Sequence, residues 1–329
     1  GRMAADRREQ ALAALGLMAV RHLAPKQWGH EPTKWSVRAS IAGEDAPFRL
    51  ERIWPWGFSP AGSGSAVPLV LGASDTETSP DIALLTDRFP GTRRGNEPAA
   101  VVLVDGACTI DGAWPVCRSL RRRDDQSPTF GISAPEGARL REALARGAKV
   151  TLDWSLETTI RQARPITVVA RLAAREGAPP GHLLVCAHGD SDSGGPGAND
   201  NASGVAIVLE IARAWTAAIE AGDLEPPPRE VRFAIWGTEI ASTRAYLESD
   251  LGAGVFAVLN FDQAGYGTTG QRLHVEPDDL PGNVGFVRTA AGVLGTFGGT
   301  KGFPERWATN KCLGGTDSYV FSCSMRFRE

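Results

Sequence analysis

A histidine and an aspartate near the middle of the chain have the types and the spacing of a divalent-metal site. His188 ends the short apolar run 182–187, and Asp200 follows it across a glycine-rich loop, directly before a segment with helical periodicity. Imidazole nitrogen and carboxylate oxygen are both common ligands of Zn²⁺. We therefore expect this loop to hold a metal ion between a strand end and a helix start.

Two further carboxylates follow strand-like runs. Glu239 comes after the run 230–236, and Asp262 comes directly after the run 255–261. In open α/β sheets, ligands gather at the carboxyl ends of the strands. One histidine and three carboxylates at successive strand ends form a coherent hydrolytic metal centre, whereas any one of them alone would mean little.

The elements around these residues have recognisable patterns. The run 182–187 is apolar after His182, which is typical of a strand buried on both faces of a parallel sheet. Asp190 lies two residues beyond His188 and can accept the second ring N–H of that histidine, as outer partners of metal-bound histidines do. Segment 201–221 is predicted to be an amphipathic helix packed on the sheet, because its apolar residues recur at helical spacing.

The order of these motifs resembles a known enzyme family. His-x-Asp, Pro-Gly-Ala-x-Asp-Asn-Ala-Ser-Gly, Trp-Gly-x-Glu and Asn-x-Asp follow one another over about residues 160–325, as in the zinc-dependent exopeptidases that include bacterial leucyl aminopeptidases and glutamate carboxypeptidase. The resemblance implies an α/β fold in which helices flank a mostly parallel sheet. It also implies that His188, Asp200 and Asp262 bind one zinc ion, that Asp200 bridges to a second, and that Glu239 is the general base.

The sequence departs from the family pattern at both ligands that are unique to the second metal. Ile240 stands where the family has a second glutamate, and Ser318 stands where it often has a histidine. The last histidine is His274, which is a candidate for a substitute ligand. Three explanations are open: the missing histidine follows residue 329, Glu239 is itself the second ligand, or the protein uses one metal or none.

We expect a metal-dependent peptide or amide hydrolase of aminopeptidase type, with one zinc ion and two as the alternative. Its substrate would be a peptide or a small amide. Two other functions compete with this prediction. A non-catalytic scaffold or binding protein, of which the transferrin receptor is an example in the same family, would explain the lost ligands. A single-zinc cyclase of the same fold would differ in its product.

Composition is that of a globular protein. The 329 residues carry a net charge of −3, with 42% hydrophobic and 22% charged residues. Lysine and arginine are scattered, so we expect no nucleic-acid partner. We recognise no signal peptide and no apolar stretch of the roughly 20 residues that cross a bilayer, so we expect a soluble chain without a membrane partner. The compartment, cytoplasmic or mature secreted, and the oligomeric state stay open.

Three segments are predicted. Residues 1–59 form an N-terminal helix and lead-in, residues 60–155 form an inserted β-rich domain, and residues 156–329 form the peptidase-like domain. The middle segment resembles the protease-associated domain of the same peptidases, which implies a lid that limits substrate entry. Cys108 and Cys117 are close enough in sequence for a disulfide, but free thiols are the favoured interpretation.

Overall fold

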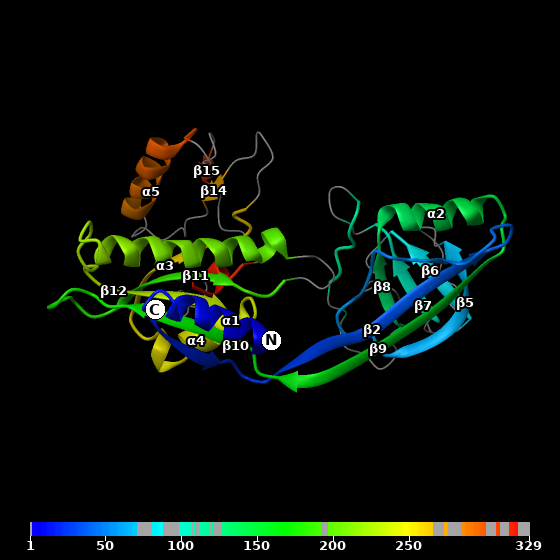
Figure 1. The fold of residues 1–329 in the computed structure, drawn as a ribbon, viewed down its shortest axis with the longest axis horizontal. Helices are drawn as coiled ribbons and strands as arrows, with labels where there is room; N and C mark the ends of the chain where they lie inside the picture. Colours follow the sequence, from blue (N-terminus) through cyan, green and yellow to red (C-terminus); the bar gives the residue numbers. More distant parts are fainter. Residues whose placement is uncertain are drawn as a thin grey trace. The chain divides into compact units, whose positions relative to one another are not determined.

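Figure 1 shows the fold of the protein in a computed structural model. The structure describes residues 2–70, 81–87, 99–106, 108, 112–118, 120, 127–191, 197–265, 273–275, 284–300, 307–309 and 316–321. The chain divides into two compact units. The first unit comprises Gly1–Lys26, Arg164–Asp190 and Gly197–Glu329, and the inserted unit comprises Gln27–Ala163 and Ser191–Pro196.

The first unit is built on a five-stranded sheet of order β1-β10-β12-β11-β13. The strands are β1 (Met18–Leu23), β10 (Ile166–Leu172), β11 (His182–His188), β12 (Glu230–Trp236) and β13 (Val255–Asn260). Strand β11 pairs in parallel with β12 and with β13, while β10 pairs antiparallel with β12 and β1. The predicted α/β class is confirmed, and the three strands that precede the candidate site residues are the parallel ones. Their carboxyl ends therefore lie at one edge of the sheet.

Helices cover both faces of this sheet. Helix α1 (Arg2–Ala13) and helix α3 (Gly204–Glu220) contribute to one core with β10, β11 and β12, which includes Leu12, Val208 and Phe233. Helix α4 (Ala241–Leu247) contributes Tyr246 to a second core with Trp236. Burial of these apolar side chains is what holds the helices on the sheet.

Helix α3 continues from the short η2 segment (Ala198–Ser203), and Figure 1 shows it running along the sheet. The combined span Ala198–Glu220 is long and apolar enough to cross a membrane by length and composition, which differs from the expectation that no such stretch exists. In the structure its apolar side packs on the sheet through Val208 and Ala212.

The inserted unit contains an eight-stranded sheet of order β3-β2-β9-β5-β6-β7-β8-β4. Its elements are β2 (Gln27–Ile41), β3 (Phe48–Arg49), β4 (Ile53–Pro55), β5 (Gly62–Val70), β6 (Ile82–Thr86), β7 (Val101–Val104), β8 (Thr129–Ile132), helix α2 (Ala134–Ala145) and β9 (Val150–Ala163). Helix α2 begins after Ser133, whose backbone N–H and hydroxyl both donate to the Glu136 carboxylate in a capping-box arrangement. No disulfide joins Cys108 and Cys117: their Sγ atoms donate to the carbonyl oxygens of Asp105 at 3.1 Å and Trp54 at 3.4 Å.

The boundaries of the inserted unit differ from the predicted limits of residues 60 and 155. Strand β2 pairs with β9 from Gln27 opposite Ala163 to Ile41 opposite Val150. Residues 27–41 therefore belong with the inserted unit instead of with the N-terminal lead-in, and the unit extends to Ala163. The likeness of this unit to a protease-associated domain stays a prediction.

The remaining described elements belong to the first unit. They are η3 (Asp250–Gly252), β14 (Leu273–Val275), α5 (Val284–Phe297) and β15 (Trp307–Thr309). Strands β14 and β15 pair in parallel as a separate two-stranded sheet. His274, the candidate substitute ligand, lies in β14, and its side chain is outside the described part of the structure.

A glycine at the start of α3 is required by a close backbone contact. A Cβ atom on Gly204 would lie 2.3 Å from the carbonyl oxygen of Phe261. We expect Gly204→Ala to lower the free energy of unfolding by about 1–3 kcal/mol, because the helix must move off the sheet. Gly292→Ala is the control: this exposed glycine inside α5 has nothing within 4 Å of a built Cβ, so the change should stabilise by about 0.5–1 kcal/mol. Urea unfolding of both variants measures the difference, and equal effects would contradict the explanation.

His182, at the start of β11, makes stability depend on pH. Its Nε2 lies 3.1 Å from the Tyr246 hydroxyl, and burial, together with the nearby Arg232 charge, lowers its pKa from 6.5 to about 4. The unfolded chain therefore binds a proton near pH 6.5 that the folded chain does not bind until about pH 4. The free energy of unfolding is therefore unaffected by His182 above pH 6.5 and decreases as the pH falls below that value. At pH 5 the decrease is about 2 kcal/mol. His182→Gln should remove that part of the pH dependence in urea titrations, and an unchanged pH profile would show that another group is responsible.

Candidate metal centre

His188 lies at the carboxyl end of β11 and is surrounded by carboxylates. Its ring is buried, with 3% of the residue exposed. On one side, Nδ1 lies 3.1 Å from the backbone oxygen and 3.3 Å from Oδ1 of Asp190. On the other side, Nε2 lies 3.3 Å from Oδ1 of Asp200 and 3.3 Å from Oδ1 of Asp262. The structure thus brings together the residues that the sequence predicts as metal ligands.

The electrostatic field at this position favours a cation. Burial alone would lower the pKa of His188, but hydrogen bonds to the three aspartates raise it to about 12. Burial likewise opposes ionisation of Asp262, yet hydrogen bonds to His188 and Thr316 lower the pKa of that carboxyl below its usual range. Anionic oxygens converging on a buried imidazole require a positive charge among them, and a divalent ion would supply it in place of the proton.

The donor set fits a zinc ion. His188, Glu239 and Asp262 each offer a ligand atom, and these atoms all lie within 4.8 Å of one another. Asp200 joins this group through its contact with the same imidazole nitrogen as Asp262. A nitrogen donor with carboxylate oxygens matches the ligand types of zinc sites, and three protein ligands with an open position are typical of catalytic ones.

Asp190 connects the histidine to Glu239. Its Oδ1 lies near His188 Nδ1 and also accepts a hydrogen bond of 2.9 Å from the backbone N–H of Glu239. Arg8 of α1 donates to the carbonyl oxygen of Gly189, the residue between the histidine and the aspartate. The Asp190 carboxylate therefore orients the His188 imidazole and also fixes the backbone of Glu239, which follows β12.

Glu239 is half-buried beside this cluster, and its environment favours the protonated acid. Burial raises the pKa of Glu239 to about 7, and the negative charges of Asp317, Asp262 and Asp190 add to the effect, while His188 opposes it. A carboxyl group that titrates near neutral pH is suited to accept a proton and to release it again. The position of Glu239 in the cluster is compatible with both roles weighed from the sequence, metal ligand and base.

Asn201, to which the sequence analysis assigned no role, fastens the loop that carries Asp200 (the metal loop) to the end of β13. Its buried side chain donates from Nδ2 to the Phe261 carbonyl at 2.9 Å, and its Oδ1 accepts from the backbone N–H groups of Gly204 at 3.0 Å and Gln263 at 3.3 Å. These bonds hold the segments that carry Asp200 and Asp262 at a fixed separation. The signal for it in the sequence is its place in the Pro-Gly-Ala-x-Asp-Asn-Ala-Ser-Gly motif, directly after Asp200.

Asp317 is the second residue that sequence reasoning missed. It is fully buried, and its Oδ1 accepts hydrogen bonds from the backbone N–H of Ile240 at 2.6 Å and from the Thr243 hydroxyl. Burial raises its pKa to about 6, against the opposing effect of those hydrogen bonds. The sequence analysis considered only the adjacent Ser318, which stands where the family often has a histidine, whereas Asp317 makes the contacts.

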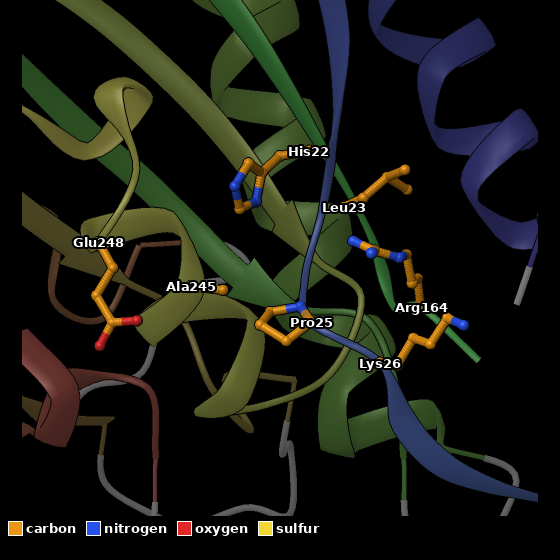
Figure 2. Close-up of a pocket in the computed structure, with 7 residues that line it drawn as sticks. All are labelled: His22, Leu23, Pro25, Lys26, Arg164, Ala245 and Glu248. Atoms are coloured by element: carbon orange, nitrogen blue, oxygen red, sulfur yellow. The ribbon is translucent and has the colours of Figure 1, made fainter. Parts of the chain in front are cut away.

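A cavity of about 530 Å³ lies elsewhere in the first unit, between the end of β1 and α4 (Figure 2). His22, Leu23, Pro25, Lys26, Arg164, Ala245 and Glu248 line it. It contains none of the predicted site residues. The candidate site is therefore the cluster of carboxylates around His188, because its groups can bind a metal ion and transfer a proton.

Residues 167–322 match the model of Peptidase family M28. Over 194 residues, the chain is 30% identical to the "Probable lipoprotein aminopeptidase LpqL" of Mycobacterium tuberculosis, which covers 54% of this chain and 36% of that protein. It is also 34% identical over 123 residues to an aminopeptidase of Pseudomonas aeruginosa, covering 35% of this chain and 22% of that one. The chain thus spans about a third or less of these relatives.

Solved structures share the fold. A Peptidase M28 precursor from Shewanella amazonensis aligns with a TM-score of 0.71 and 18% identity over 98% of this chain and 76% of that one. The zinc aminopeptidase BSAP from Bacillus subtilis aligns with a TM-score of 0.63 and 18% identity over 97% of this chain and 76% of that one. Together with the family match, these findings confirm the predicted resemblance to zinc-dependent exopeptidases.

The contacts of His188 predict its effect on metal binding. We expect His188→Ala to abolish stoichiometric zinc binding, because the nitrogen donor that faces Asp200 and Asp262 is removed. His30→Ala is the matched control, since this histidine lies in the inserted unit and contacts the carbonyl oxygen of Ser59. Elemental analysis after dialysis measures both. Equal zinc content in the two variants would exclude His188 as a ligand.

Proposed function

We propose that this chain is a zinc-dependent peptidase of aminopeptidase type. The observation that carries the proposal is the convergence of His188, Asp200, Asp262 and Glu239 at one sheet edge. The match of residues 167–322 to Peptidase family M28 supports it, as do the aminopeptidases among the relatives. The substrate class that fits is a peptide or small amide.

Each residue has a role in this proposal. His188, Asp200 and Asp262 hold the zinc ion, which when bound activates water and polarises the scissile carbonyl. Glu239 takes a proton from the attacking water and delivers it to the leaving amine, a task that suits its raised pKa. Asp190 keeps the His188 ring in place and anchors the Glu239 backbone through the bonds described above.

One zinc ion is the proposed stoichiometry. The side chain of Ile240 has no atom that can bind a metal. Among the described residues, one group of side chains could hold a metal ion, and it consists of His188, Glu239 and Asp262. Residues 310–315 and 322–329 lie outside the described part of the chain. Measuring the number of zinc ions bound per chain therefore tests whether these residues contribute to a second metal site. Two zinc equivalents would favour the dinuclear alternative.

A non-catalytic binding protein is the competing function, and Ile240 is the observation that favours it. A single-zinc cyclase on the same fold is the other alternative. The three are separated by product: a peptidase releases an amino acid from a peptide, a cyclase releases a ring-closed amide, and a binding protein releases neither. The predicted absence of nucleic-acid and membrane partners, and the compartment, stay predictions.

Replacing the proposed base tests the mechanism. Glu239→Gln keeps the size of the side chain but cannot accept the proton, so kcat should fall about 10²–10⁴-fold while zinc content stays constant. Glu248→Gln is the matched control, an exposed glutamate just after α4. Peptide hydrolysis by the zinc-loaded proteins gives kcat and KM. Full activity in the Glu239 variant would end the assignment, and an inactive zinc-loaded wild type would favour the binding protein.

A further inference from the structure

The backbone makes a strained turn directly after Glu239. Ile240 has φ 59° and ψ −54°, and the N–H of Ala241 donates to the carbonyl oxygen of Glu239 at 2.5 Å. A bond from residue i+2 to residue i around a positive φ is a γ-turn of the rare, strained type. A positive φ is especially unfavourable for a β-branched residue such as isoleucine. This conformation persists only if the surroundings hold it.

Asp317 supplies the contacts that hold the turn. One carboxylate oxygen accepts from the Ile240 N–H at 2.6 Å and from the hydroxyl of Thr243, one turn later in α4. Thr243 and Asp317 are both fully buried. The bond to a charged acceptor in a buried site is stronger than one between neutral groups, so it can offset the strain of the turn.

Glu239 is thereby fixed from two sides. Its own N–H donates to Asp190, and the N–H of the next residue donates to Asp317. The second oxygen of Asp317, Oδ2, is buried and has no hydrogen-bond partner among the described residues. Keeping a carboxylate under such desolvation is unfavourable for folding, which points to a role at the neighbouring site.

We propose that Asp317 is a positioning residue that holds the Glu239–Ile240 turn, so that the Glu239 carboxylate stays beside His188 and Asp262. The inference rests on the proposed function of Glu239 and gives a role to a buried aspartate that touches no reacting atom. The isoleucine at position 240 increases this dependence. Because a positive φ is unfavourable for isoleucine, the turn needs the contacts of Asp317 more than it would with glycine at this position.

Kinetics test the dependence between the two positions. Asp317→Ala should lower kcat about 10- to 100-fold with KM and zinc content unchanged, because the base is displaced. Asp317→Asn should recover most of that loss, since its amide oxygen can accept from Ile240 and Thr243. In the Ile240→Gly background, the loss caused by Asp317→Ala should shrink to less than about threefold, because glycine adopts a positive φ without strain.

A structural measurement separates this inference from the proposed function. Crystal structures of the metal-free proteins should show residue 240 at positive φ in the wild type and outside that region in Asp317→Ala, with the Glu239 carboxylate moved away from His188. If the wild type hydrolyses no peptide but the turn changes in this way, the proposed function fails and the positioning role stands. If residue 240 keeps its positive φ in Asp317→Ala, the positioning role is wrong.

Two further outcomes decide the kinetic test. An equal loss of kcat in the isoleucine and glycine backgrounds would show that Asp317 acts in some other way, and so would loss of zinc from Asp317→Ala. If Asp317→Ala does not fold, Thr243→Val removes the second donor to the same oxygen at constant volume. It should lower kcat a few-fold in the isoleucine background alone, and no effect there would also overturn the proposal.

Discussion

The first unit is organised around an electrostatic constraint at the end of β11. The imidazole of His188 is buried, and three aspartates approach its two nitrogens. Carboxylates gathered so closely repel one another unless a positive charge lies among them. A cation at this position, either the proton on the imidazole or a metal ion in its place, relieves that repulsion. The loop, the neighbouring strands and helix α3 bring these groups together.

The fold meets this constraint with three parallel strands whose carboxyl ends lie side by side. Strand β11 brings His188, strand β12 leads to Glu239, and strand β13 leads to Asp262. Hydrogen bonds to backbone groups then fix the ends: Asn201 joins the metal loop to β13, and Asp190 joins β11 to the residue after β12. Rigid strand ends with locked connections keep such a site preorganised.

Strain and burial are concentrated at the same edge. Ile240 has an unfavourable backbone conformation, and Asp317 is a buried carboxylate with one unpartnered oxygen among the described residues. Departures from locally favourable structure are expected where function sets the geometry. The residue next to Glu239 thus carries no donor for a metal, yet its backbone amide is part of the network that supports the site.

The sequence by itself determined the candidate metal ligands and the class of the fold. The apolar run before His188 and the helical periodicity after Asp200 are local patterns, and local periodicity reports secondary structure directly. Tertiary structure decided the rest. Asp317 meets Ile240 across 77 residues, and β2 pairs with β9 across more than a hundred, which moved the limits of the inserted unit from residues 60 and 155 to 27 and 163. No motif or periodicity in the sequence marks these two contacts, because hydrogen bonding and strand pairing are set by the folded geometry and not by distance along the sequence.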